Sequence, residues 1–288
     1  MKVLVTGASG RLGRVVCQEL ARAGHDVRAT DRRFAALEVP LTLADLREPL
    51  APYPLLEGRD ALVHLGNIPN LNGGAAPQVV LGENTTINAN VFRAAVELGV
   101  KRIVFASSLQ AMIRLDHGQP SAEPPFGIPY FPLDGDAPPN PGDNFYALSK
   151  EFAERTLRLM CSLDPALTCT ALRFPMLAGE WFTNRLQTPL PPSGLNRSEG
   201  LTYLKLDDAA RVVALVLERQ QPGYHQYFPA QAVEIEGMPA AAVIAELFPQ
   251  TPLNRPAESI HSLVDLSALE RDVGFRPGAP LTVRLERR

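Results

Sequence analysis

The chain has 288 residues, of which 28 are Lys or Arg and 31 are Asp or Glu, giving a net charge of −3, and 45% are hydrophobic. Those values exclude a disordered chain, and the lack of a basic excess argues against a nucleic-acid binder. No apolar run reaches the roughly 18 residues of a membrane-spanning helix, and the start lacks the apolar stretch of a secretion signal. Cys17, Cys161 and Cys169 form no C-x-x-C pair, which predicts a cytoplasmic protein without a metal site.

Short apolar runs and amphipathic patterns alternate along the first 175 residues. Strands are expected at residues 2–6, 26–30, 41–44, 61–65, 102–106 and 168–174, and helices at residues 11–23, 85–98 and 145–163. Apolar strands that alternate with helices are typical of buried parallel sheets. The pattern therefore predicts an α/β fold, a Rossmann-type doubly wound parallel sheet.

The rest of the chain follows a different pattern. A helix is expected at residues 206–218, a strand at 223–229 and a helix at 238–247, between stretches with little periodicity. We expect this part to form a small C-terminal lobe over the carboxyl edge of the sheet, where ligands of such folds bind.

A glycine-rich stretch, Gly7-Ala8-Ser9-Gly10-Arg11-Leu12-Gly13, separates the first strand from the first helix. Its glycines permit a tight turn and a close approach of the backbone to phosphate, and the helix N-terminus offers free N–H groups. Asp31 ends the second strand, where its carboxylate could accept hydrogen bonds from a ribose diol. The stretch therefore predicts a dinucleotide cofactor.

The residues around Asp31 leave the choice of dinucleotide open. The charge of Asp31 repels the 2′-phosphate of NADP and so favours NAD. Arg32 and Arg33 follow directly, and a guanidinium could pair with that phosphate. NAD is the preferred prediction and NADP the alternative.

Tyr146 and Lys150 are four residues apart in the helix expected at 145–163, so they share a face. A nearby ammonium favours phenolate over phenol, which lowers the pKa of the tyrosine and makes it a usable acid and base. Ser107 and Ser108 follow the strand at 102–106, where a hydroxyl could hydrogen-bond the reacting oxygen. The pattern predicts an acid/base site beside the glycine-rich stretch.

With these residues in place, the chain resembles the extended short-chain dehydrogenase/reductase superfamily, of the NAD-dependent epimerase/dehydratase type. The resemblance rests on residues 5–13, 45–46, 63–66, 84, 104–108, 146, 150, 172–175, 206–211 and 269–277. Residues 63–66 and 102–108 are also similar to uronate dehydrogenases, although Leu109 and Gln110 stand where those enzymes have Asn-His. The absence of an acid at these two positions argues against a dehydratase.

The resemblance implies a role for each matching position. The catalytic residues would be Ser108, Tyr146 and Lys150. The cofactor would be bound by Gly7, Gly10, Arg11, Leu12, Gly13, Asp31, Arg32, Asp45, Leu46, Leu65, Gly66, Asn67, Asn84, Ser107, Tyr146, Lys150, Phe174 and Pro175. Substrate contacts are expected from Ser108, Leu109, Gln110, Tyr146 and Arg173, although Arg173 could instead pair with a carboxylate inside the protein.

The resemblance implies an NAD(P)-dependent oxidoreductase that transfers a hydride between the nicotinamide and a hydroxyl or carbonyl of a small sugar-like substrate. Tyr146 would act as the general acid and base. An NAD-dependent sugar epimerase stays open as an alternative, and so does a dinucleotide-binding sensor without catalysis. His117 could contact the substrate.

The expected organisation follows from these roles. Residues 1–174, with part of residues 203–230, would bind NAD(P), and residues 175–288 would form a substrate-binding lobe that does not fold independently. By analogy with the superfamily, a homodimer could form through the helices expected at 85–98 and 145–163.

Overall fold

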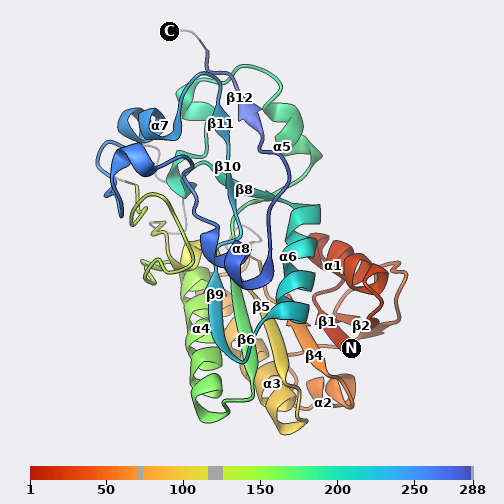
Figure 1. Ribbon diagram of the computed structural model, residues 1–288. Coiled ribbons are helices and arrows are strands. Elements are labelled where there is room, and N and C mark those ends of the chain that lie inside the picture. The colour runs from red at the N-terminus through yellow and green to blue at the C-terminus, as the bar shows by residue number, and fades with distance from the viewer. Residues whose placement is uncertain (70–73, 116–125, 287–288) are drawn as a thin grey trace.

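The computed structural model describes residues 1–69, 74–115 and 126–286. Its centre is a seven-stranded parallel sheet with the strand order β3-β2-β1-β4-β5-β6-β9 (Figure 1). The strands are β1 (Lys2–Thr6), β2 (Asp26–Asp31), β3 (Leu41–Leu43), β4 (Ala61–His64), β5 (Arg102–Ser108), β6 (Thr168–Phe174) and β9 (Gly223–Tyr227). The order reverses beside β1, and sheets of this kind bind ligands in a crevice at the carboxyl ends of the strands at that point, here β1 and β4.

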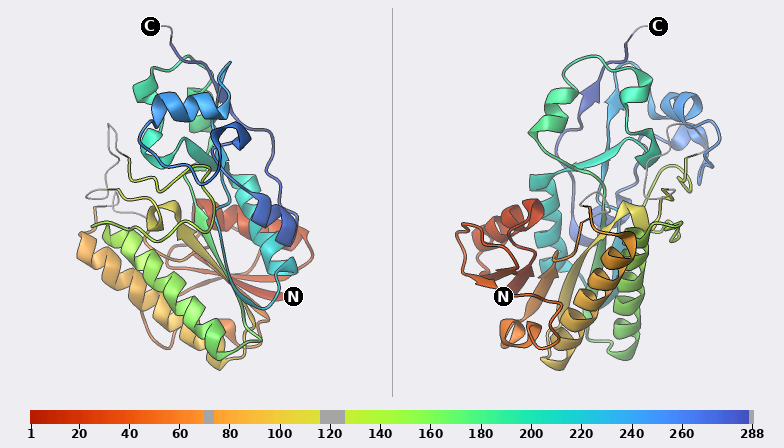
Figure 2. Two further views of the ribbon diagram at one scale, coloured as in Figure 1. Left: turned by 60° about the vertical axis from the view of Figure 1, so that its left-hand side comes forward. Right: turned by 180° about the vertical axis from the view of Figure 1, so that it is seen from behind.

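Helices cover both faces of this sheet. One face carries α1 (Arg11–Arg22), α6 (Leu206–Arg219) and α8 (Ser267–Val273), and the other carries α2 (Pro52–Leu56), α3 (Pro77–Glu97) and α4 (Phe145–Leu163). Figure 2 shows α3 and α4 side by side along their length. Alternate strand residues supply the two cores: Val3 and Val5 pack with α1 and α6, while Leu4 packs on the α3 side.

A second lobe lies over the carboxyl ends of the strands (Figures 1 and 2). It contains β7 (Leu177–Ala178), α5 (Glu180–Arg185), η3 (Pro192–Gly194), η4 (Arg197–Glu199), β8 (Thr202–Lys205), β10 (Gln231–Ala232), β11 (Glu234–Ile235), α7 (Ala240–Leu247), η5 (Ala257–Ser259) and β12 (Thr282–Val283). Its core is built around Phe131, Tyr203, Phe228 and Phe248. The short helix η1 (Leu109–Ala111), directly after β5, also joins this core. The two parts therefore meet where β5 and β6 end.

The structure confirms the predicted α/β fold and corrects one helix boundary. Helix α3 begins at Pro77, eight residues before the predicted start at residue 85. Proline is well suited to the first helical turn because its missing N–H has no helical partner there. Within the described ranges, none of the helices has the length and apolar character needed to span a membrane. The same residues contain no group of three or more His, Cys, Asp or Glu side chains able to hold a metal ion.

Candidate active site

The backbone around the glycine-rich loop is packed so tightly that side chains at Gly7 and Gly13 would collide with backbone atoms. Gly7 has a φ of +69°, and a Cβ added there would lie 2.6 Å from the carbonyl carbon of Leu65. A Cβ on Gly13 would lie 2.3 Å from the Gly7 carbonyl oxygen. Gly10 caps α1 without a side-chain hydrogen bond, so the first N–H groups of this 12-residue helix stay available. This cradle fits the pyrophosphate of a dinucleotide.

Asp31 stands at the end of β2, directly beside this loop. Its Oδ2 accepts a hydrogen bond from Ser9 N at 3.0 Å, and its Oδ1 accepts one from Arg33 N at 3.0 Å. The carboxylate is partly exposed, and each oxygen keeps a further lone pair for a ribose hydroxyl. Arg32 is exposed, with its Nη1 3.9 Å from a Glu83 carboxylate oxygen.

Asp45 and Leu46 follow β3, next to Asp31 in the sheet. Arg47 donates from Nε to both Asp45 oxygens, at 2.9 and 3.0 Å, and this hydrogen bonding lowers the pKa of Asp45 to about 2. The Leu46 side chain is buried, and its carbonyl oxygen accepts from Asn90 Nδ2 at 3.0 Å. Both residues therefore lie at the adenosine end of the predicted cofactor crevice.

Lys150 lies at the other end of the crevice and is almost fully buried. Its Nζ donates to Asn67 Oδ1 and to the Ala106 carbonyl oxygen, both at 2.8 Å. An ammonium has three N–H donors, so one is left for a ligand. Burial lowers the pKa of Lys150 to about 7, and the Nζ lies 5.5 Å from the centre of the Tyr146 ring. Asn67 thus connects Lys150 to the loop that faces Gly7.

Tyr146 and Ser108 meet beside Lys150. The two side chains hydrogen-bond each other, and Ser108 Oγ also accepts from Gln110 N at 3.2 Å. Asn144 caps α4 by accepting from Ala147 N at 3.1 Å, which fixes the helical turn that carries Tyr146. The structure therefore brings the predicted trio of Ser108, Tyr146 and Lys150 together at one point.

The predicted lowering of the Tyr146 pKa is wrong. Burial raises the pKa of Tyr146 to about 12, and this effect exceeds the opposing effect of the Ser108 hydrogen bond. The negative charge of Glu199 raises it further. Lys150, with its own pKa near 7, carries only part of a positive charge at neutral pH.

Arg173 does not face the substrate side, which corrects the prediction of a substrate contact. Its side chain is fully buried and donates to both oxygens of Glu154, at 3.0 and 2.8 Å, and to the Ala137 carbonyl oxygen at 2.6 Å. The predicted alternative, a carboxylate inside the protein, is confirmed. Ser107 is also corrected as a cofactor contact through its side chain, because its hydroxyl donates to Glu154 Oε1 at 2.5 Å.

Asn84 and Leu109 also need correction as ligand contacts. Asn84 is fully buried, and its amide bonds the backbone N–H and carbonyl of Ile68, at 2.8 and 3.1 Å, and Ser149 Oγ at 3.1 Å. It holds the loop after β4 against α4, and its side chain is 0% exposed, so it presents no surface to a cofactor. The Leu109 side chain, the first of η1, is buried in the core of the lobe.

The other predicted cofactor residues lie at the glycine-rich loop, after β4 and at the end of β6. Arg11 reaches from the glycine-rich loop to the lobe and donates from Nη2 to the Leu177 carbonyl oxygen at 2.9 Å. Leu12, Leu65 and Gly66 are partly buried at the loop, and Phe174 and Pro175 are buried at the end of β6. His117 lies outside the described residues.

Sequence reasoning missed three residues that shape the site. Asn144 precedes Tyr146 by two positions and could have been found as a helix-capping asparagine. Glu154 shares the α4 face of Lys150, four residues later, but its partner Arg173 gives no local signal. Glu199 comes from η4 in the lobe and hydrogen-bonds Gln110. A single sequence contains no pattern that connects positions so far apart.

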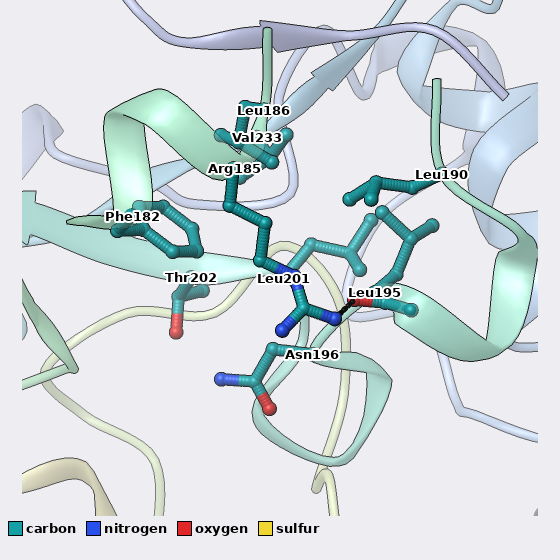
Figure 3. A pocket seen from close by; sticks show the side chains of 10 residues that line it. Phe182, Arg185, Leu186, Leu190, Leu195, Asn196, Leu201, Thr202 and Val233 are labelled. Atoms are coloured by element: carbon teal, nitrogen blue, oxygen red, sulfur yellow. Dashed lines mark hydrogen bonds between the residues drawn. The ribbon is translucent and has the colours of Figure 1, made fainter. Parts of the chain in front are cut away.

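A small pocket in the lobe is too confined to hold a sugar. It encloses about 20 Å³ and is lined mainly by apolar side chains, with Arg185, Asn196 and Thr202 as polar neighbours. Figure 3 shows the Arg185 side chain crossing it, with the guanidinium beside Asn196. That volume holds about one water molecule, so this pocket is not a site for a sugar.

Comparisons with known proteins agree with this geometry. A uronate dehydrogenase of Pseudomonas syringae pv. tomato is 27% identical over 227 residues, which are 77% of this chain and 72% of that protein. An L-arabinose 1-dehydrogenase (NAD(P)(+)) of Haloferax volcanii is 32% identical over 154 residues, 53% of this chain and 58% of that protein. The solved uronate dehydrogenase from Agrobacterium tumefaciens shares the fold, with a TM-score of 0.63 at 22% identity, covering 97% of this chain and 85% of that chain.

These matches confirm the fold class and the resemblance, and the matching family model is that of an NAD dependent family. The model of the NAD dependent epimerase/dehydratase family matches residues 3–227. The chain therefore belongs to the NAD dependent epimerase/dehydratase family.

Proposed function

We propose that the chain is an NAD-dependent oxidoreductase that transfers a hydride between the nicotinamide and a hydroxyl-bearing carbon of a small sugar. The observation that carries this proposal is the meeting of Ser108, Tyr146 and Lys150 at the nicotinamide end of the crevice. The substrate class is supported by the related proteins, which include dehydrogenases of uronate and L-arabinose.

Each residue of the trio has one task in the proposed reaction. Tyr146 accepts the proton of the substrate hydroxyl as that carbon is oxidised, and returns a proton in the reverse direction. Ser108 donates a hydrogen bond to the same oxygen and holds it beside the phenol. Lys150 uses its remaining donor on the cofactor ribose and its charge to favour the phenolate. Bound NAD would supply the hydride acceptor.

Different residues along the crevice would bind different parts of the cofactor. The loop from Gly7 to Gly13 would hold the pyrophosphate and Asp31 the adenosine ribose. Calorimetric titration with NAD, NADH, NADP and NADPH tests this assignment. A preference of about tenfold or more, roughly 1.4 kcal/mol, for NAD and NADH is expected from the carboxylate of Asp31. A preference for the phosphorylated pair would assign the recognition to Arg32 or Arg33.

Turnover by wild-type protein and by Tyr146→Phe tests the proposed chemistry. With sugars of the relatives' classes and NAD, wild type should accumulate NADH, whereas Tyr146→Phe should bind NAD normally and produce almost none. An epimerase would convert the sugar without net NADH. Tight cofactor binding with no conversion of any sugar would support a sensor. Unchanged turnover in Tyr146→Phe would exclude that residue as the acid and base.

The remaining assignments concern organisation. We propose that residues 175–288 bind the sugar and residues 1–174 the cofactor, in a cytoplasmic protein whose three cysteines are free thiols. We also propose a homodimer through α3 and α4, because α4 exposes Phe152, Leu159 and Leu163 along one face. Light scattering should give a dimer mass for wild type and a monomer mass for Leu159→Glu.

A further inference from the structure

Glu199 is a partly buried carboxylate beside the catalytic trio that the proposed reaction leaves without a role. Asn196 Nδ2 donates to its Oε2 at 2.7 Å, and the Gln110 side chain also hydrogen-bonds it. Within residues 1–69, 74–115 and 126–286, both partners are neutral amides and no ion pair involves Glu199. A carboxylate offers about four acceptor sites, so capacity for a ligand remains.

Gln110 connects this carboxylate to the reacting end of the crevice. Its backbone N–H donates to Ser108 Oγ at 3.2 Å, and its Oε1 accepts from Asn144 Nδ2 at 2.9 Å. Asn144 in turn caps the helix that carries Tyr146. Gln110 thus lies between Glu199 and the hydroxyl of Ser108. The charge of Glu199 also raises the pKa of Tyr146.

The two residues after Glu199 have a backbone conformation that is unfavourable for a residue with a side chain. Gly200 and Leu201 both adopt left-handed conformations, with φ of +67° and +59°. For a residue with a side chain this conformation costs on the order of 1–3 kcal/mol and persists only where the surroundings enforce it. Leu201 is buried in the core of the lobe, and Thr202 Oγ1 donates to the Glu199 carbonyl oxygen at 2.7 Å. The turn therefore fixes Glu199 against the site.

Cationic side chains nearby have other contacts. Arg185 donates from Nη2 to the Gly194 carbonyl oxygen at 3.2 Å, and the Arg197 guanidinium lies 5.5 Å from the centre of the Phe126 ring. Among the residues that the structure describes, no cation pairs with the Glu199 carboxylate. Such an acceptor is suited to a neutral donor such as a hydroxyl, and it repels a second carboxylate at the same point.

We propose that Glu199 is a substrate-contact residue that accepts a hydrogen bond from the hydroxyl next to the reacting carbon, so that the enzyme is specific for vicinal diols. This inference rests on the proposed oxidoreductase function, because an oxygen held by Ser108 and Tyr146 places the neighbouring hydroxyl of a sugar toward Gln110 and Glu199.

The test compares aldoses with their 2-deoxy counterparts, using NADH formation from L-arabinose, D-galactose and D-glucose 6-phosphate. Wild type should prefer the parent sugar by about 10-fold or more, the effect of one hydrogen bond to a charged group. Glu199→Gln should lower the preference for the parent over the 2-deoxy analogue about 10-fold, a ratio in which the effect of the lost charge on Tyr146 cancels. Glu234→Gln, an exposed carboxyl of the same lobe, is the matched control and should not change this preference.

The outcomes separate the two proposals. Equal use of parent and 2-deoxy sugars by wild type would overturn the diol specificity, whatever the variant does. Equal losses on both sugars in Glu199→Gln would assign Glu199 a structural role and also overturn it. No NADH from any sugar with wild type would overturn the proposed function, and the inference with it.

Discussion

Arg173→Met should destabilise the protein strongly, because it leaves a buried carboxylate without its cation. Glu154 is 3% exposed and Arg173 is 0% exposed, and the guanidinium satisfies both Glu154 oxygens and the Ala137 carbonyl oxygen. Removing one partner of a buried ion pair costs about 3–5 kcal/mol of the free energy of unfolding. At roughly 2–4 °C per kcal/mol for a chain somewhat shorter than this one, Tm should fall by about 10 °C.

Two further variants determine whether the loss comes from the unpaired charge. Arg173→Met combined with Glu154→Leu removes both charges and should recover most of the lost stability, since apolar replacements of buried pairs are often neutral. Arg93→Met breaks the 2.8 Å pair between two exposed side chains, Arg93 and Glu97, and should cost at most about 1 kcal/mol. Urea unfolding and thermal circular dichroism measure all three.

The same variant tests the alternative role for Arg173. If Arg173 bound a substrate carboxylate, Arg173→Met would keep a nearly wild-type Tm and raise KM for uronates alone. That combination would refute the buried-pair reasoning.

Two more predictions concern residues predicted to bind the cofactor, Gly13 and Lys150. Gly13→Ala should weaken NAD binding by at least about tenfold in calorimetry, because its Cβ would lie 2.3 Å from the Gly7 carbonyl oxygen. Gly82→Ala is the control and should not change NAD binding, because Gly82 has open space around it. Equal Kd values for Gly13→Ala and wild type would contradict the cradle. The stability of Lys150→Met relative to wild type should decrease from pH 7 to pH 10 in urea unfolding. The pKa of Lys150 is about 7 in the folded protein and 10.5 when exposed, so wild type bears the full cost of burying the charge below pH 7. Above pH 7 this cost diminishes by up to about 1.4 kcal/mol per pH unit, which stabilises wild type relative to the variant. A difference in stability that does not change with pH would contradict the lowered pKa.

The sheet could be predicted because its strands and helices are locally encoded. The strands at 2–6 and 168–174 and the helix at 145–163 have the predicted bounds, since apolar runs and the cap at Asn144 define them. The lobe could not be predicted in this way. Its strands β7, β10, β11 and β12 have two residues each, too short for a periodic pattern, and they form only because the lobe core assembles around them.

The same distinction applies to the site. Residues in continuous motifs, such as Gly7 to Gly13 and the Tyr146/Lys150 pair, lie where the sequence predicts them. Arg173 shows where this reasoning stops, because its position at the end of β6 is correct but its direction depends on Glu154 from α4. Glu199 depends on contacts with Gln110, 89 residues earlier in the chain, which no local pattern encodes.

The electrostatics of the trio bear on the proposed role of Tyr146 as a base. In the structure described here, burial favours the neutral forms of both Tyr146 and Lys150, with pKa values of about 12 and about 7, and Glu199 opposes ionisation of the phenol. A phenol with that pKa is a poor base at neutral pH. A positive charge beside it favours the phenolate, and the oxidised nicotinamide carries such a charge. If Tyr146 is the base that we propose, the charge of the oxidised nicotinamide would therefore act against the effect of burial on its pKa.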